Sequence, residues 1–245
     1  MDLAKQNSVA YSHVSFSYPG GVRALKNICF TLQSGQRLGI IGPNGAGKST
    51  LLLLLNGVLT PQQGEIYIHG HIVNSKNEAM IKTQVGLVFQ NPEDQLFCPT
   101  VFEDVAFGPL NFGRGLEQAR RLVKAALSEV GLSDYENRST LNLSFGEKKL
   151  VAIATVLSTD PSIVALDEPS GNLDALHRRK IIRWIRSSKR TFLVTSHDLD
   201  LLYDTCDHVL LLNNGEIIAL GEAKEILTNQ KLLEKNDLEL PLRFQ

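Results

Sequence analysis

A glycine-rich loop at residues 42–49 constrains the fold of this chain more than any other segment. It matches the pattern G-x-x-x-x-G-K-[ST] and lies between an apolar stretch at 36–41 and a leucine run that starts at Leu51. Glycines let backbone N–H groups approach phosphate oxygens closely, and the N-terminus of the following helix adds the positive end of its dipole. The sequence therefore predicts a phosphate-binding loop between a β-strand and a helix, which is the context that this pattern requires.

Two residues of the loop have predicted roles of their own. The Lys48 ammonium would reach the β- and γ-phosphates of a bound nucleotide, and the Ser49 hydroxyl would ligate Mg²⁺. A glycine-rich turn without a ligand is the alternative, which the intact spacing and flanks disfavour. The loop alone does not separate a kinase, a GTPase or a motor. The residues predicted to hold the nucleotide here are Gly42, Asn44, Gly45, Ala46, Gly47, Lys48, Ser49 and Thr50.

Two adjacent carboxylates, Asp167 and Glu168, follow an apolar strand that starts at Ile163. Charging both there is unfavourable unless a cation or a reacting water compensates. In a mononucleotide-binding fold, Asp167 would hold Mg²⁺ through water, and Glu168 would orient and polarise the attacking water as a general base. A solvent-exposed acidic turn before Pro169 is the alternative. Because a kinase would more often need an acceptor site at this point, Glu168 favours hydrolysis.

Two further polar residues end predicted strands. Gln90 closes the strand at 85–90, and its neutral amide can bond both Mg²⁺ and water without carrying charge. His197 follows the apolar strand at 191–195 and could contact the γ-phosphate. Taken alone, a glutamine at a strand end is usually a surface residue, and a lone histidine is usually structural. Their predicted catalytic roles, and the metal-binding role of Gln90, rest on their order around Asp167 and Glu168.

The alternation of predicted strands and helices along the chain indicates an α/β fold. Strands that alternate with helices imply a mostly parallel sheet, and the interval from about 91 to 160 is interpreted as a helical insertion within a single domain, 1–245. A helix is expected to begin at Ser144 as N-cap, with Glu147 completing a capping box. Asn213-Asn214-Gly215 indicates a hairpin. The leucine-studded stretch 223–245 is predicted to be a helical tail packed on its own domain.

Composition narrows the class of protein. At 245 residues the chain can bury a large core, and its net charge of -1 provides no bulk field that would attract nucleic acid. The basic run 178–190 contains Ile181, Ile182, Trp184 and Ile185, so an amphipathic helix is favoured over a nucleic-acid site. Three scattered cysteines and a polar start at residues 1–7 predict a reducing cytoplasm. The longest apolar run is far shorter than the roughly 20 residues that span a bilayer.

Taken together, these motifs resemble those of the ATP-binding-cassette (ABC) ATPases. Between the loop and the carboxylates lies the pentapeptide 143–147, Leu-Ser-Phe-Gly-Glu, which is similar to the signature of that family. Tyr18 resembles the aromatic residue that stacks on adenine, Gln90 the Q-loop glutamine, Asp174 the D-loop aspartate and His197 the switch histidine. The resemblance covers about residues 8–222. It implies a P-loop NTPase core with an N-terminal antiparallel β-subdomain, an inserted α-helical subdomain, and ATP and Mg²⁺ as ligands.

The resemblance also implies an assembly. In this family two cassettes pair head-to-tail, and each nucleotide lies between one subunit's phosphate loop and the other's signature. Ser144 and Gly146 would then donate hydrogen bonds to the partner's γ-phosphate, and Glu147 and Asp174 would line the same nucleotide site. Two residues depart from the family pattern: Phe145 replaces the usual glycine and Leu150 the common arginine. Phenylalanine is compatible with the motif only if that position does not need a positive φ.

The segments 89–97 and 99–109 resemble the cassettes of energy-coupling-factor importers, particularly the cobalt and nickel uptake ATPases. By that resemblance, Phe97, Phe102 and Phe107 would form an apolar groove for a basic coupling helix of an integral membrane subunit. The groove would be rimmed by Glu93, Asp94, Glu103 and Asp104, with a solvated acidic face as the alternative for these four residues. Ordinary core packing is the alternative for the aromatic residues, and is expected for at least one of the three.

The sequence thus predicts an ATP-hydrolysing subunit that drives import of cobalt or nickel ions through separate membrane subunits. It would lie at the cytoplasmic face of the cell membrane, paired with a second copy or a close paralogue, and would not bind nucleic acid. A vitamin importer of the same type stays open, because substrate contacts would lie in another chain. A soluble ATP-gated clamp would carry long coiled-coil insertions or further domains, and a translation-factor cassette would normally carry two such domains in tandem.

Overall fold

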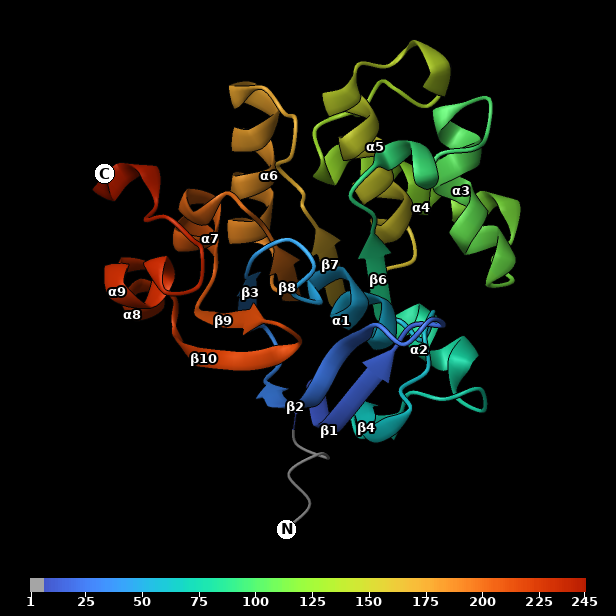
Figure 1. Cartoon of the computed structure of the whole chain (residues 1–245). Helices are drawn as coiled ribbons and strands as arrows, with labels where there is room; N and C mark the ends of the chain where they lie inside the picture. The colour runs from blue at the N-terminus through green and yellow to red at the C-terminus, as the bar shows by residue number, and fades with distance from the viewer. Residues whose placement is uncertain (1–6) are drawn as a thin grey trace.

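The computed structural model describes residues 7–245, so most of the polar start considered above lies outside the described residues. The described residues form two β-sheets with helices packed around them (Figure 1). The larger sheet has the strand order β10-β9-β3-β8-β7-β6. Its strands are β3 (Arg37–Ile41), β6 (Val85–Val88), β7 (Ile163–Asp167), β8 (Thr191–Thr195), β9 (His208–Asn213) and β10 (Glu216–Glu222).

Five strands of the larger sheet run parallel, and β10 pairs antiparallel to β9 at one edge. Both faces of the parallel strands are buried, as the apolar runs in their sequences require. The residues of β7 alternate between two cores. Val164 and Leu166 pack with the helices on one face, whereas Ile163 and Ala165 pack with residues of the smaller sheet on the other.

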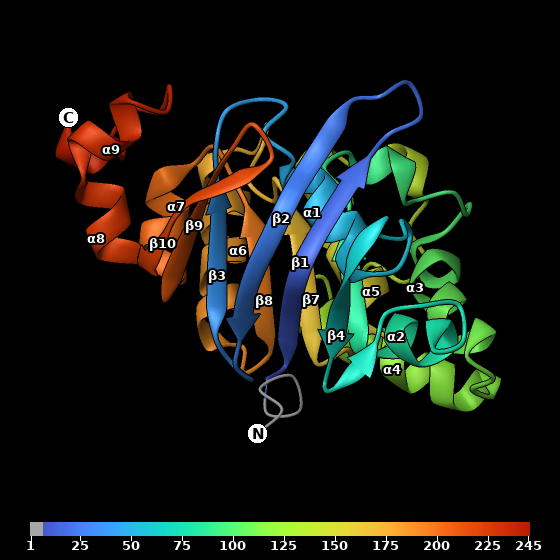
Figure 2. The same ribbon diagram turned by 60° about the horizontal axis from the view of Figure 1, so that its bottom comes forward.

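The smaller sheet is antiparallel, with the order β2-β1-β4-β5. Its strands are β1 (Val9–Ser17), β2 (Arg23–Leu32), β4 (Gln63–Ile68) and β5 (His71–Ile72). Figure 2 shows β1, β2 and β4 crossing the molecule in front of α1 (Lys48–Leu55). Buried side chains of β1 and β2 share a core with the α1 leucines and with the near face of the larger sheet. The helix α1 is therefore enclosed between the two sheets.

A helical layer lies beside the far edge strand β6, in the green to yellow part of Figure 1. It contains α3 (Val101–Asn111), α4 (Leu116–Glu129) and α5 (Phe145–Leu157), and α2 (Glu78–Gln84) precedes β6. Thr100 caps α3 and Ser144 caps α5, each through a reciprocal capping box with a glutamate three residues on. The predicted cap at Ser144 is therefore confirmed. The helix α5 joins the layer to the sheet, because its buried face contributes to the same core as β7.

The remaining α-helices of the described residues share the core of α5, and follow it across the same face of the larger sheet. They are α6 (Ala175–Ser187), α7 (Leu199–Thr205), α8 (Ala223–Thr228) and α9 (Gln230–Glu234). The basic run lies on α6, which buries Ile181, Trp184 and Ile185, as predicted for an amphipathic helix. Buried Leu227 and Leu233 hold the C-terminal segment on its own fold. Beyond α9, however, that segment contains a turn, an irregular stretch and a short 3-10 helix at Leu242–Phe244 rather than a continuous α-helix.

Element boundaries differ from the sequence expectation in two places that matter for the site. The helix after the glycine-rich loop begins at Lys48, within the loop motif itself, because Gly47 adopts a left-handed conformation and starts the first turn. The strand before Gln90 ends at Val88, so Gln90 lies in the following loop. Within residues 7–245, no helix combines the length and the apolar character that crossing a bilayer requires.

Candidate nucleotide site

The carboxyl ends of four parallel strands converge at one edge of the larger sheet. The glycine-rich loop follows β3, Glu168 follows β7, His197 follows β8, and Gln90 follows β6. Since β3, β8, β7 and β6 are adjacent in that order, these segments meet although they are far apart in sequence. A crevice at the carboxyl ends of the strands is where open α/β sheets bind ligands.

These segments enclose a pocket of about 340 Å³. The predicted loop residues from Asn44 to Thr50 line it, together with Gln90, Asp167, Glu168, His197 and Tyr18. Gly42 is buried and does not itself line the pocket. The structure thus brings together the candidate residues of the phosphate loop, the paired carboxylates, the Q-loop and the switch position. The pocket also contains Val22, Arg23 and Ala24, which motif reasoning did not single out.

The conformation of the loop depends on glycine at position 47. Gly47 has a φ of 107°, and a Cβ there would lie 2.5 Å from the carbonyl oxygen of Ala24. Lys48 curls back over the loop, with its Nζ donating to the carbonyl oxygens of Gly42 at 2.7 Å and Pro43 at 3.2 Å. The first N–H groups of α1 have no partners within the helix. The loop therefore gathers N–H donors and one ammonium group around the same volume.

Glu168 has the most unusual environment in the pocket. It is buried, and its backbone adopts a φ of 45°, a conformation that costs a non-glycine residue about 1–3 kcal/mol. The hydroxyl and carbonyl oxygens of Thr195 accept from its N–H. One carboxylate oxygen, Oε2, accepts from the N–H of His197 at 3.0 Å, and Oε1 is buried without a hydrogen-bond partner among residues 7–245. One carboxylate oxygen is therefore fixed by a backbone N–H, and the other is buried without a hydrogen-bond partner among the described residues.

The neighbouring groups supply the oxygen ligands that Mg²⁺ prefers. Asp167 lies at the end of β7, and its Oδ1 accepts from the Thr195 hydroxyl at 2.6 Å. The exposed Ser49 hydroxyl and the exposed Gln90 amide face the same pocket. One carboxylate, one hydroxyl and one amide around a water-accessible volume fit a hydrated Mg²⁺ bound together with phosphate oxygens.

Tyr18 forms the outer wall of the pocket. Its hydroxyl lies 3.1 Å from that of Thr50, and its ring meets Phe16 edge-on at a centroid distance of 5.0 Å. These two contacts fix the plane of a ring that is still 37% exposed. A fixed and accessible aromatic face beside a phosphate loop fits a planar base.

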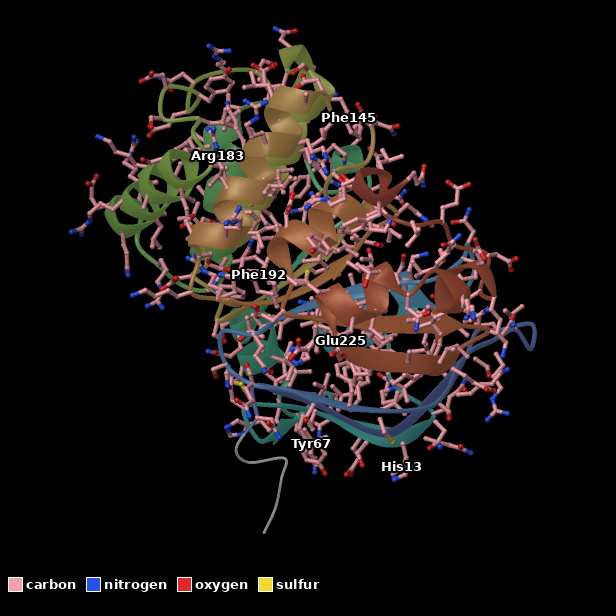
Figure 3. The ribbon with its side chains drawn as sticks, turned by 90° about the vertical axis from the view of Figure 1, so that its left-hand side faces the viewer. His13, Tyr67, Phe145, Arg183, Phe192 and Glu225 are labelled. Carbon is pink, nitrogen blue, oxygen red and sulfur yellow. The ribbon has the colours of Figure 1, made fainter. Side chains whose placement is uncertain are left out.

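Ser144, Gly146, Glu147 and Asp174 do not line this pocket. Ser144, Gly146 and Glu147 form the N-terminus of α5, and Asp174 caps α6 by accepting from the N–H of His177 at 2.8 Å. In Figure 3, Phe145 lies at the opposite end of the molecule from His13 and Tyr67 on the antiparallel sheet. The candidate residues predicted from the sequence therefore lie in two separate groups, one lining the pocket and one outside it.

The replacement of glycine by Phe145 is compatible with the local backbone. Phe145 is the first residue of α5, and it is not among the residues with positive φ. Position 145 therefore does not need a positive φ, which is the condition under which phenylalanine is compatible with the motif. Leu150, in place of the common arginine, is buried in the core, where it lines a cavity that Ile181 and Trp184 of α6 also line.

Gly146 is required by packing within the chain. A Cβ at this position would lie 2.6 Å from Cγ and 2.7 Å from Nδ1 of His177. The His177 ring is not free to turn away, because its Nδ1 lies 2.8 Å from Oδ2 of Asp174. Gly146 of the signature and Asp174 of the D-loop are thus linked through one imidazole.

We expect Gly146→Ala to destabilise the fold by about 1–3 kcal/mol, because the added methyl forces His177 from its place. His177→Ala should relieve that clash, so the double variant should be more stable than the sum of the two single changes predicts. Urea unfolding of the four proteins measures this coupling, which we expect to be about 1 kcal/mol or more. If the changes in unfolding free energy of the two single variants simply add in the double variant, the Gly146–His177 contact does not affect stability.

Glu147 anchors the start of α5 through several bonds. Its Oε1 accepts from the Tyr135 hydroxyl at 2.6 Å, and its Oε2 accepts from the N–H of Ser144 at 2.8 Å. The Tyr135 bond, followed by the Ser144 bonds and the nearby Arg138, lowers the pKa of Glu147 to about 2 from a usual 4.5. The carboxylate is therefore more strongly favoured in the folded chain than in the unfolded one.

A pH dependence follows from this shift. Because the folded pKa is depressed, the stabilisation is fully present above pH 4.5 and is lost as the pH falls towards 2. The difference in unfolding free energy between wild type and Glu147→Gln should therefore be constant near neutrality and shrink over that acidic window. Tyr135→Phe should remove part of the effect. A difference that does not vary with pH would contradict the assignment.

The three phenylalanines do not form one groove. Phe97 and Phe107 are exposed and meet edge-on at a centroid distance of 4.9 Å. Phe102 instead packs against the core, with the guanidinium of Arg120 5.2 Å from its ring centroid. Asp104 is also not a rim residue: it is buried, and its Oδ1 accepts from the N–H groups of Phe97 and Cys98. Its role is to fix the loop that presents Phe97.

Comparison with known proteins shows the family of the chain. Residues 25–171 match the ABC transporter family. The energy-coupling factor transporter ATP-binding protein EcfA of Methanothermobacter thermautotrophicus is 46% identical over 93% of this chain and 75% of its own length. EcfA1 of Methanospirillum hungatei is 44% identical over 92% of this chain and 83% of its own length.

Solved structures give the same result. The cbiO1 protein of Clostridium perfringens, described as part of the ABC transporter complex cbiONQ, superimposes with a TM-score of 0.83 at 33% identity over 96% of both chains. A dimeric ATP-binding cassette, MJ0796 with ADP and Pi, superimposes with a TM-score of 0.81 at 26% identity over 88% of this chain and 98% of that one.

The chain therefore belongs to the ABC transporter family and is an ATPase whose hydrolysis is coupled to transport. Within that family it is of the energy-coupling-factor type.

Several residues that shape the site were not predicted from the sequence. Thr195 holds both Asp167 and the backbone of Glu168, and His177 covers Gly146. Lys149 is fully buried beside the Gln90 loop, where burial lowers its pKa to about 8 while Asp167 and Glu168 act to raise it. The sequence singled out Lys149 only as the second residue after the signature pentapeptide.

Proposed function

We propose that the pocket at the carboxyl edge of the larger sheet hydrolyses ATP, and that this drives uptake of cobalt or nickel ions through separate membrane subunits. The observation that supports it most strongly is the convergence on one pocket of the loop with Lys48, of Glu168 and of His197. Each of these groups alone has an ordinary structural explanation. Their convergence from three strands fits phosphoryl chemistry.

In this proposal, the loop N–H groups and Lys48 bind the phosphates, and the Tyr18 ring stacks on the base. Ser49, Gln90 and Asp167 would hold Mg²⁺, directly or through water. The metal would neutralise charge that develops on the phosphate oxygens. Because Ser49 follows Lys48 in the first turn of α1, the two ligand types are placed side by side by one helix.

Glu168 would act as the general base. Its Oε1 is the unpartnered oxygen, so it can accept a proton from a water positioned for in-line attack. The N–H of His197 holds Oε2, which orients the carboxylate, and the His197 ring lies 3.6 Å from Oε1 and 3.5 Å from the Lys48 ammonium. His197 would therefore contact the γ-phosphate beside the Lys48 ammonium.

The active unit would be a pair of cassettes, either two copies or one copy and a close paralogue. Ser144 and Gly146 lie at the start of α5, away from their own pocket, at a helix N-terminus that favours anions. In a head-to-tail pair they would face the partner's γ-phosphate, with Glu147 and Asp174 at the same junction. The dimeric MJ0796 cassette with ADP and Pi supports this arrangement by analogy.

The membrane subunit would dock over the exposed aromatic pair, Phe97 and Phe107. Leu110 and Phe112 are exposed on the same helix and just after it, which extends the apolar surface. The pair is held in place by the buried Asp104 and by the Thr100–Glu103 cap of α3. Such a surface fits an amphipathic coupling helix and would place the chain at the cytoplasmic face of the cell membrane.

Co-purification and uptake test this function together. Tagged full-length chain is purified from detergent-solubilised membranes, and cells carrying wild type or Glu168→Gln are assayed for uptake of radioactive cobalt and nickel. We expect membrane subunits to co-purify with both forms, and metal uptake to be lost only with the variant. Uptake of a vitamin, and not of metal, that depends on Glu168 would favour the vitamin-importing alternative. Nucleic acid recovered without membrane subunits would contradict transport.

A further inference from the structure

Lys149 is a charged residue in a fully buried position on α5. Its side chain is 0% exposed, and its neighbours along the helix, Leu150 and Val151, are core residues. The Nζ donates to the carbonyl oxygens of Phe89 at 3.0 Å and Gln90 at 2.7 Å. An ammonium group on the signature helix is therefore bonded directly to the backbone of the predicted metal ligand.

A buried ammonium is retained only where hydrogen bonds and opposite charges compensate for lost hydration. The two carbonyl oxygens supply the hydrogen bonds, and the carboxylates of Asp167 and Glu168 act on Lys149 electrostatically. An apolar residue of similar length would fill the same space without that cost. The charge therefore needs an explanation beyond packing.

Two more contacts tie the same loop to the same helix. Gln95 accepts from the N–H of Phe89 at 3.1 Å and donates to the carbonyl oxygen of Ala152 at 2.8 Å. Lys148 pairs with Glu93 at 2.6 Å. Gln95 also donates to the Thr155 hydroxyl at 2.8 Å, so the segment from Phe89 to Gln95 is bonded to four residues of α5, and the Lys149 contact is the one that reaches Gln90.

We propose that Lys149 is a positioning residue that couples the signature helix to Gln90. When Ser144 and Gly146 at the start of α5 engage the partner's nucleotide, a shift of α5 moves Lys149 and so places Gln90 within its own pocket. In a pair of cassettes, one nucleotide site would thereby influence the other. This inference rests on the proposed function for its catalytic consequence, although the contact between Lys149 and the loop does not.

The test compares two variants. Lys149→Met keeps the length of the side chain but removes the hydrogen-bond donors and the charge, whereas Lys149→Arg keeps the donors and the charge. Lys124→Met, on the exposed face of α4, is the matched control. Two quantities are measured on folded full-length protein: steady-state ATP hydrolysis as a function of ATP and Mg²⁺, and amide hydrogen exchange of residues 89–95 without nucleotide.

We expect Lys149→Met to lower kcat by about tenfold or more, because misplacing a metal and water ligand affects the reaction more than binding. KM for ATP should change by less than about threefold, and the Mg²⁺ requirement should rise. Exchange of the 89–95 amides should become faster. Lys149→Arg should recover most of kcat and of the protection, and Lys124→Met should match wild type.

A folded Lys149→Met variant with wild-type kcat, or with unchanged exchange in the 89–95 loop, would overturn the proposal. If that variant does not fold, Lys149→Gln replaces it, since its shorter neutral amide should lose the same contacts and show the same defects. If wild type itself shows no ATP hydrolysis, the proposed function fails, while the exchange comparison still decides whether Lys149 positions the loop.

Discussion

Replacing Glu168 with glutamine should almost abolish steady-state ATP hydrolysis while leaving ATP binding intact. The substitution keeps the shape of the side chain and its bond to the N–H of His197, but removes the basic oxygen that would accept a proton from water. Loss of a general base lowers the rate by about 10²–10⁴-fold. Phosphate release measures the rate, and equilibrium binding of labelled ATP measures affinity.

The same variant should accumulate as an ATP-bound dimer, since hydrolysis is the step that reopens the pair. Light scattering during gel filtration, with and without MgATP, measures this. Glu117→Gln, on the exposed first turn of α4, is the control for removing a carboxylate elsewhere. A monomeric Glu168→Gln protein that still turns over at the wild-type rate would remove Glu168 from the mechanism.

The second large effect concerns the split site. Ser144→Arg should abolish ATPase activity, because the long side chain at the start of α5 would block the partner's phosphates. Lys48→Ala should also abolish activity, because it removes the ammonium from the phosphate loop. Each variant alone should be inactive as a homodimer. Neither loss of ATPase activity should be due to unfolding. Chemical denaturation should show that both variants remain folded under the assay conditions.

Mixing the two inactive variants should restore activity. A mixed dimer contains one composite site with an intact loop from one chain and an intact signature from the other, and one site with both defects. If the chains exchange at random and the sites act independently, recovery should reach about a quarter of wild type. Absence of recovery in demonstrably mixed dimers would contradict the sandwich arrangement or the independence of its sites.

The placement of the pocket residues could be predicted because it depends on topology alone. Asp167 ends one apolar strand, and Gln90 and His197 follow two others. Parallel strands with helical crossovers bring such ends to one edge of the sheet. The capping box of Ser144 and Glu147 could be predicted because it is encoded within four residues. The sequence allowed Phe145 in the signature on the condition that this position does not need a positive φ. In the structure, Phe145 is the first residue of α5.

Other features depend on contacts that no local pattern encodes. Phe102 and Phe107 look equivalent in the sequence, but their positions on α3 turn one ring to the core and leave the other exposed. Asp104 looks like a surface acid, yet it is buried because two N–H groups of the loop before α3 need an acceptor. Lys149 looks like the second of two solvated lysines, and only the packing of α5 against the Gln90 loop reveals its role.

The central claim is that the nucleotide site of this chain is completed by a second subunit. Structure determination of Glu168→Gln with MgATP tests it most directly. We expect two chains, with each ATP held between the loop 42–50 of one and Ser144 and Gly146 of the other, and with Gln90 and Asp167 at the metal. A single chain that binds MgATP with Ser144 and Gly146 facing solvent would contradict the claim.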